Sequence, residues 1–257
     1  LPRGRARSGR VVTMVGALGG MGTTSIAVQA GLIWAEKKSV CLIDMDVQFG
    51  NAALYLNMRT QLSLADLIEA GERVDEEFLR SVADRHVSGL SIVACPPDIM
   101  PLDMLTPEFV DKLIDVANQT CDIVLGDLPS AWVNWSLSVL QRSDAICLIT
   151  NISVPGVHQA RRQLELLDAN GLGDKLQIVA NRVTNPMFGK ADLSETETVL
   201  KRKINHPITN DFPTVSAAID EGKTLAAIKV KSRVEKDIRQ LVTVLGAVVG
   251  TDQAAAT

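Results

Sequence analysis

The stretch GALGGMGTTS, residues 16–25, decides the fold. It follows an apolar run typical of a strand and precedes a pattern typical of a helix, which is the setting of a phosphate-binding loop. A P-loop is written G-x-x-x-x-G-K-[ST]; its Lys contacts the β- and γ-phosphates and its Ser or Thr holds Mg²⁺. Here the six-residue frame runs from Ala17 to Gly22, and Thr23 stands in the place of the Lys. The stretch is either a nucleotide site without its usual cation or a plain glycine turn.

Short apolar runs alternate with longer amphipathic patterns on the C-terminal side of this loop. Strands are predicted at residues 11–16, 40–44, 90–95, 122–127, 145–150 and 176–181. Each run is nearly continuous in apolar residues, as expected for strands that helices cover on both faces. Helical patterns between the strands include residues 24–37, 106–119 and 157–170. The alternation predicts an α/β fold: a doubly wound, mostly parallel sheet flanked by helices, with right-handed crossovers.

Length and composition favour one domain. A chain of 257 residues can bury one large core, and we assign residues 10–250 to a single domain. Residues 1–9 contain three Arg and no apolar core, and we interpret them as a linker that follows a removed N-terminal domain; residues 251–257 form a tail. Residues 234–249 have apolar positions at a helical period and little positive charge, which indicates a helix that covers the core.

Charge and hydropathy exclude some functions. No apolar run approaches the roughly 20 residues that a membrane-spanning helix needs. The net charge of −4 gives no general attraction to nucleic acid. The basic groups at 161–162 and 201–203 are interpreted as solvated helix faces rather than DNA contacts. The four cysteines lie in apolar, strand-like runs without metal-site or redox spacing, so we expect free buried thiols: Cys41, Cys95, Cys121 and Cys147.

Polar residues follow several of the predicted strands. The segments 44–46, 127–129 and 181–182 read Asp-Met-Asp, Asp-Leu-Pro and Asn-Arg. Since ligands of such sheets bind outside the carboxyl ends of the strands, these segments are expected to lie beside the glycine loop.

Each of these residues has a functional and a structural interpretation. Gly19, Gly20 and Gly22 allow backbone N–H groups to turn toward an anion at a helix N-terminus, which requires no lysine. Thr24 is placed like a Mg²⁺-binding hydroxyl or a helix cap, and Asp127 like a metal-binding carboxylate or a turn residue. Asp44 and Asp46 could orient a water or a hydrated metal, or be solvated loop charges.

Taken together, these motifs resemble the deviant Walker A ATPases of the ParA/MinD type. That family has a KGGxGK[ST]T loop, then DxD and DxP segments, and an Asn near the base. Residues 18–25, 44–46, 127–129 and 181–182 fall into those positions, and the resemblance extends from residue 10 to about 247. Within the family the chain is similar to the TadZ/CpaE branch, which positions the assembly of Flp/Tad-type pili. The stretches GALGGMGTTS, DLPSAWVNWS (127–136) and DFPTVSAAIDEGKTL (211–225) carry this likeness. Members often have an N-terminal receiver-like domain, consistent with a linker at residues 1–9.

The resemblance implies ATP and Mg²⁺ as ligands. Asn181 would contact adenine, Thr24 and Asp127 would hold Mg²⁺, and Asp44 and Asp46 would act in catalysis. The residues implied to bind nucleotide are Gly19, Gly20, Met21, Gly22, Thr23, Thr24, Ser25, Asn181, Arg182, Phe212 and Pro213, the last two lining the base pocket. From the residues themselves, Asn181 could equally be a strand-end turn residue and Phe212 a core aromatic.

The resemblance also implies a homodimer whose partners are Tad/Flp pilus-assembly proteins. It places the protein in the cytoplasm, with recruitment to the cell pole or the inner membrane face through those partners. Nucleic acid is not an expected partner. Trp132 and Trp135 lie in the segment that the family uses as a switch, and either face a dimer partner or pack in the core.

The chain departs from the family at two lysines. One would stand at Thr23, and the other, which crosses the dimer in the family, at Leu18. Both losses weaken stabilisation of the transferring phosphoryl group more than they weaken binding, so we predict an ATP-binding protein with weak or absent ATPase activity. Two alternatives stay open: an active ATPase in which Arg182 or Lys223 supplies the charge, and a nucleotide-free interaction scaffold.

Overall fold

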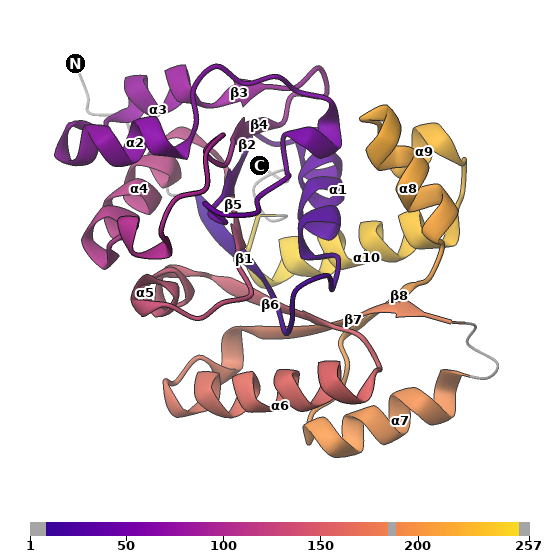
Figure 1. Ribbon diagram of the computed structural model, residues 1–257. Helices are drawn as coiled ribbons and strands as arrows, with labels where there is room; N and C mark the ends of the chain where they lie inside the picture. The colour runs from indigo at the N-terminus through magenta and orange to yellow at the C-terminus, as the bar shows by residue number, and fades with distance from the viewer. Residues whose placement is uncertain (1–8, 185–188, 252–257) are drawn as a thin grey trace.

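The computed structural model describes residues 9–184 and 189–251, with residues 189–192 described by their backbone alone. Figure 1 shows a central sheet with helices on both sides. Residues 1–8 of the predicted linker and residues 252–257 of the predicted tail lie outside the described residues.

Eight strands form one sheet in the order β3-β4-β2-β5-β1-β6-β7-β8. All neighbours are parallel except β3, which runs antiparallel to β4. The bounds are β1 Arg10–Gly16, β2 Val40–Asp44, β3 Asp84–Arg85, β4 Ser91–Val93, β5 Ile123–Leu128, β6 Ala145–Thr150, β7 Leu176–Val183 and β8 His206–Thr209. The six predicted strands and the doubly wound α/β fold are confirmed. The two further strands are short edge strands with polar residues, and therefore lack the apolar signal of buried strands.

Two layers of helices cover the sheet. The helices are α1 Thr23–Ala35, α2 Leu64–Ala70, α3 Glu76–Val82, α4 Pro107–Thr120, α5 Asn134–Arg142, α6 Val154–Ala169, α7 Gly189–Leu200, α8 Phe212–Glu221, α9 Leu225–Ile228 and α10 Arg233–Val248. On β1, Val11 and Val15 pack into a core with residues of α2 to α7, whereas Val12 and Met14 pack into a second core with α1 and α8 to α10. The alternation of side chains along a strand thus fills both cores from one continuous apolar run.

The last helix covers the sheet, as its sequence pattern predicts. Val234, Ile238, Leu241 and Leu245 of α10 are buried at a helical period. Among the residues that the structure describes, no helix is both long and apolar enough to cross a membrane.

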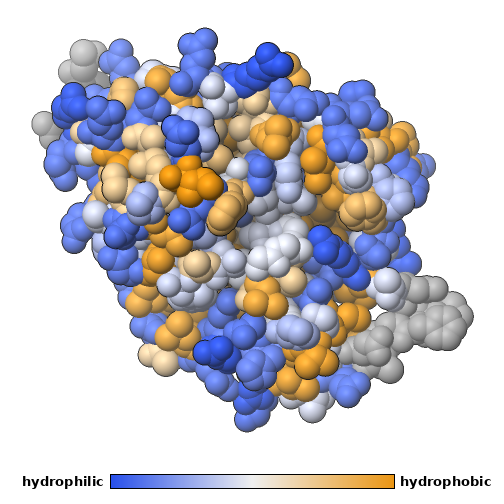
Figure 2. All heavy atoms as spheres, viewed as in Figure 1, coloured by the Kyte–Doolittle hydropathy of each residue, from blue (hydrophilic) through white to orange (hydrophobic). Residues whose placement is uncertain are grey.

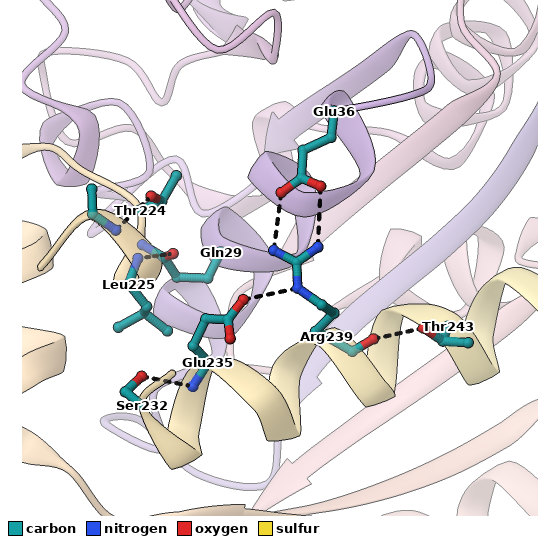
Figure 3. Close-up of polar contacts among 9 residues, drawn as sticks. Gln29, Glu36, Thr224, Leu225, Ser232, Glu235, Arg239 and Thr243 are labelled. Atoms are coloured by element: carbon teal, nitrogen blue, oxygen red, sulfur yellow. Dashed lines mark hydrogen bonds and ion pairs between the residues drawn. The ribbon is translucent and has the colours of Figure 1, made fainter. Parts of the chain in front are cut away.

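Polar contacts hold α1 against the C-terminal helices (Figure 3). The Arg239 guanidinium of α10 donates to both carboxylate oxygens of Glu36 at 3.0 and 3.1 Å, just after α1. The buried side-chain amide of Gln29, within α1, accepts from the Leu225 N–H at 3.0 Å and donates to the Lys223 carbonyl at 3.1 Å. Because α1 begins in the glycine loop, these contacts also position the loop.

The structure corrects part of the expectation for the cysteines. All four are free, but only Cys41 and Cys147 are buried and lie in strands. Cys95 follows β4, and Cys121 is the C-cap residue of α4, each partly exposed. Apolar neighbours in sequence therefore predicted strand positions for two residues that lie at element ends.

Two tryptophans and two arginines that the sequence analysis singled out contact other parts of this chain. Trp135 is fully buried in the core and donates from Nε1 to the Leu102 carbonyl at 2.8 Å, while Trp132 packs half-buried against the same core. Arg161 and Arg202 make ion pairs with Glu165 and Asp168. For Trp135, the core interpretation is confirmed.

Candidate functional site

The glycine loop joins β1 to α1 in a shape that exposes its amides. Gly20 and Gly22 have φ values of 76° and 84°, in the left-handed region that glycine adopts without strain. None of the backbone N–H groups of residues 19–24 donates a hydrogen bond to another described residue. Unpaired amides at the start of a 13-residue helix provide partial positive charge for an anion.

Thr23 occupies the position of the expected lysine with a short side chain that folds back on the loop. Its Oγ1 lies 2.7 Å from the place where a Cβ on Gly16 would be, so Gly16 makes room for the hydroxyl. The loop borders a cavity of about 270 Å³, which is also lined by Asp46, Phe49, Asn51, Tyr55, Leu128 and Ser130. Among these lining residues there is no Lys or Arg. Figure 2 shows a pale hollow where Figure 1 draws this loop, with apolar side chains beside it.

Asp127 and Thr24 meet at the floor of this site. Asp127 lies near the end of β5 and is 2% exposed, and the Thr24 side chain is close enough to lower the pKa of its carboxyl group. Its Oδ1 is buried without a hydrogen-bond partner. Burial, and then the charges of Asp44 and Asp46, raise the pKa of Asp127 well above its usual range, while Thr24 opposes the rise. An unpartnered carboxylate oxygen beside a hydroxyl is a donor set that suits Mg²⁺.

Asp44 lies beside Asp127 on the neighbouring strand. The two are direct partners in the β2–β5 register, and Asp44 is fully buried. Its carboxylate accepts from the backbone N–H of Ala52 at 3.0 Å and of Asp46 at 3.3 Å. Burial raises the pKa of Asp44 to about 7 against the lowering effect of these bonds. Any side chain on Gly50 would collide with this carboxylate, so glycine is required there.

Asp46 faces the glycine loop from the turn after β2. Its Oδ1 accepts from the backbone N–H of Gln48 at 3.2 Å and of Phe49 at 3.0 Å, which fixes the turn. The structure therefore brings Asp44, Asp46, Thr24 and Asp127 together around the loop, as the positions of the strand ends predict.

A second cavity of about 270 Å³ adjoins the other side of the loop. It is lined by the loop glycines Gly20 and Gly22, by polar residues that include Ser25, Asn181 and Arg182, and by apolar residues that include Ile208, Val215, Ile219 and Leu225. A mostly apolar hollow next to unpaired amides has the composition of a site for a flat ring attached to an anionic group.

Asn181 lines the second cavity and contacts the glycine loop. Its Nδ2 donates to the Met21 carbonyl at 2.8 Å, and its Oδ1 accepts from the Arg182 N–H at 2.9 Å. A Cβ on Gly22 would lie 2.5 Å from Nδ2, so the absence of a side chain there permits the contact. Arg182 has φ 58° at an irregular step of β7. Asn181 thus braces the loop, and its contact with adenine stays a prediction.

Three other predicted positions have mixed outcomes. Phe212 lines the second cavity and is 68% exposed, so its interpretation as a core aromatic is wrong. Pro213 is not among the residues that line the cavity. Lys223, named as a replacement cation, pairs with Glu221 at 2.9 Å and lines neither cavity.

Sequence reasoning missed several residues that shape the site. The buried Gln163 of α6 donates from Nε2 to the Ala17 carbonyl at 3.0 Å and so holds the start of the loop. Gly50, Phe49 and Tyr55 come from the segment after β2. Only Gly50 carried a sequence signal, since a glycine soon after a carboxylate-bearing strand end indicates close approach of the backbone.

The chain is similar to known proteins both in sequence and in structure. No protein-family model matches the sequence. The septum site-determining protein MinD of Thermotoga maritima is 22% identical over 239 residues, covering 91% of this chain and 86% of that protein. A MinD-type protein of Tupiella akineta is 23% identical over 195 residues, covering 75% of this chain and 62% of its own length.

Solved structures agree over nearly the whole chain. The ParA family ATPase of Chlorobium tepidum superposes with a TM-score of 0.83 at 24% identity, covering 92% of this chain and 98% of that one. MinD of Pyrococcus horikoshii, complexed with Mg-ADP, superposes with a TM-score of 0.77 at 18% identity, covering 94% and 98%. The chain therefore has the fold of the ParA/MinD-type P-loop ATPase superfamily.

Proposed function

We propose that this protein binds Mg²⁺-ATP as a homodimer, hydrolyses it slowly or not at all, and positions the assembly of a Flp/Tad-type pilus. The observation that carries the proposal is the glycine loop itself. Its amides, Thr24 and Asp127 are arranged as a phosphate and metal site, while no Lys or Arg lines the first cavity, which Asp46 and Phe49 share with the loop.

The residues present fit a magnesium ion. Thr24 and the unpartnered Oδ1 of Asp127 would hold it directly or through water, and Asp46 faces the same cavity. When bound, Mg²⁺ neutralises phosphate charge. The chain's own amides at residues 19–24 would orient the anion, and the second cavity would receive the base. In support, the Pyrococcus MinD, which has the same fold, is complexed with Mg-ADP.

The missing lysines affect turnover more than binding. Two unit charges about 4 Å apart interact by roughly 4 kcal/mol at an effective dielectric constant near 20, before desolvation offsets a part. Phosphoryl transfer depends almost entirely on positioning and on charges aimed at the transition state, so losing two cations slows it by several decades. Ground-state binding keeps the amides, the metal and the base contacts. A nucleotide that is bound but rarely cleaved can act as a structural ligand or a slow switch.

The proposed role in pilus assembly rests on sequence resemblance. The stretches at 16–25, 127–136 and 211–225 resemble those of the TadZ/CpaE branch. The names of the MinD relatives describe proteins that determine a site in the cell, which is the same class of task. Deleting the gene in its host should abolish Flp/Tad-type pili, and a fluorescent fusion should gather at a pole or membrane face.

Calorimetric titration with Mg²⁺-ATP tests the central claim, with ADP as the comparison and Asp127→Asn as the matched variant. We expect micromolar binding by the wild-type protein and a loss of roughly tenfold or more in the variant. Absence of binding, checked by a second probe, would support the nucleotide-free scaffold instead.

Replacing Thr23 by Lys separates the remaining alternatives. If the loop lacks only its cation, Thr23→Lys raises ATP hydrolysis, whereas Thr23→Gln, which has similar bulk and no charge, leaves it low. Substantial wild-type hydrolysis that Arg182→Ala abolishes would show instead that another cation already acts.

A further inference from the structure

Two thiols that are distant in sequence lie close together at the amino ends of β2 and β5. The glycine loop lies at the other end of the sheet, where the strands have their carboxyl ends. Cys41 is the second residue of β2, and Cys121 caps α4 just before β5. Both side chains line one cavity, Cys121 packs against the core cluster that contains Cys41, and each thiol perturbs the pKa of the other. The backbone N–H groups of Asp122 and Ile123 donate to the Ser39 carbonyl at 2.9 and 3.1 Å, which fixes the turn carrying Cys121 against the start of β2.

The pair opens into a cavity. Its volume is about 600 Å³, and both cysteines line it. The charged residues that line it are mostly cationic: Glu36, Lys37, Lys38, Arg80 and Arg85. Because this cavity lies at the amino ends of β2 and β5, it is separate from both cavities that border the loop. A small polar oxidant therefore has access to the pair without entering the nucleotide site.

The two sulfur atoms differ in character. The adjacent Cys41 thiol favours the Cys121 thiolate most, the Thr120 hydroxyl donates to the Cys121 sulfur at 3.6 Å, and Arg80 adds positive charge. Together these lower the pKa of Cys121 to about 7, against burial and the nearby Asp122. The pKa of Cys41 is raised, first by the adjacent Cys121 and then by burial. Cys121 is thus the nucleophile, and Cys41 holds the proton.

We propose that Cys121 and Cys41 form a peroxide-sensitive dithiol that closes reversibly to an intramolecular disulfide. The Cys121 thiolate attacks a peroxide oxygen: an S–O bond forms, the O–O bond breaks, and the released hydroxide takes up a proton as water. Cys41 then attacks the sulfenic sulfur. The S–S bond forms, the S–O bond breaks, and the hydroxyl leaves as water with the Cys41 proton. Peroxide is reduced by two electrons and the dithiol is oxidised by two.

Treatment of the purified chain with hydrogen peroxide, followed by peptide mapping, tests this. We expect one Cys41–Cys121 disulfide, reversed by dithiothreitol, and a rate of Cys121 oxidation that rises as pH increases through about 7. Cys95 is the internal control: it is also partly exposed, but burial and the nearby Asp44 and Asp46 raise its pKa to about 12. Cys121 should react roughly tenfold faster or more.

Two variants assign the roles. Cys121→Ser should prevent the disulfide, and Cys41→Ser should stop the reaction at a sulfenic acid on Cys121, trapped by dimedone. Equal oxidation of Cys95 and Cys121, or a sulfenic acid that persists in the wild-type protein, would overturn the proposal. Because wild-type labelling alone compares Cys121 with Cys95, the test does not depend on the variants folding.

Discussion

At the scale of single residues, the site depends on places where a side chain is absent. Gly22 has a left-handed backbone and an immediate neighbour in Asn181, whereas the position of a Cβ on Gly19 has only Ser130 Oγ nearby, at 3.7 Å. A methyl group on Gly22 would therefore strain the backbone and collide with Asn181, whereas a methyl group on Gly19 would fit.

We predict that Gly22→Ala destabilises the fold by about 1–2 kcal/mol, because a non-glycine residue is strained there. It should also weaken Mg²⁺-ATP binding by roughly tenfold or more, since Asn181 must move. Gly19→Ala is the matched control, with an expected stability change below about 1 kcal/mol. Urea denaturation and calorimetry measure the two effects. Equal behaviour of the two variants would contradict this account of the loop.

Asp44 makes stability depend on pH in an unusual direction. Its pKa is about 7 in the folded protein against 3.8 in an unfolded chain. Between these values the folded state binds more protons, so metal-free stability should fall as pH rises, by up to about 1.4 kcal/mol per pH unit for one group. Thermal unfolding with a chelator at about pH 5, 6, 7 and 8 checks this.

Mg²⁺ should reduce the loss of stability at higher pH, because it binds the ionised carboxylates of the folded state alone. Asp127→Asn provides the control: removing one of the neighbouring charges should flatten the pH dependence. Stability that rises steadily from pH 5 to 8 without metal would show that these carboxyl groups stay ionised when buried.

At the scale of elements, α1 connects the loop to the C-terminal helices by two unequal contacts. Gln29 is 6% exposed and bonds the backbone at both ends of its amide, whereas the Arg239 pairs lie at the surface (Figure 3). Buried amides leave unpaired groups when a partner is removed, while exposed ion pairs contribute little.

Accordingly, Gln29→Ala should lower the free energy of unfolding by about 1–3 kcal/mol, and Arg239→Ala by less than about 1 kcal/mol. Gln29→Ala should also weaken ATP binding, because Gln29 lines the second cavity. Chemical denaturation of both variants gives the comparison. A larger loss of stability in Arg239→Ala than in Gln29→Ala would mean that the surface ion pairs, rather than the buried amide, hold α1 against the C-terminal helices.

At the scale of the whole molecule, apolar side chains are exposed beside the proposed nucleotide site. Phe49, Leu54 and Ile99 are 69%, 65% and 69% exposed, and Phe49 lines the loop cavity. We predict that Mg²⁺-ATP shifts the protein from monomer to dimer and that Phe49→Asp prevents it. Val87→Asp, at a residue 99% exposed that lines neither loop cavity, should have no effect. Light scattering after size-exclusion chromatography, with ATP binding measured in parallel, shows whether each protein is a monomer or a dimer.

The sequence predicted the sheet, because the periodicity of apolar residues and the apolar runs are local properties of the chain. It also predicted that the polar strand ends lie close together, because parallel strands generally end at the same side of a sheet. It did not predict contacts that require the folded chain. Gln163 and Asn181 reach the loop from positions more than 140 residues away. Cys41 and Cys121 meet only because β2 and β5 are neighbours. Short polar edge strands such as β3 carry no apolar signal at all.

The hydrogen bond from Asn181 to the Met21 carbonyl affects the rate at which a nucleotide can associate. Together with Gln163 on the Ala17 carbonyl, it fastens both ends of the glycine loop before any ligand arrives. A preorganised loop loses little conformational entropy on binding, so association need not wait for a closing motion. Discrimination among nucleotides would then reside in how long each one stays.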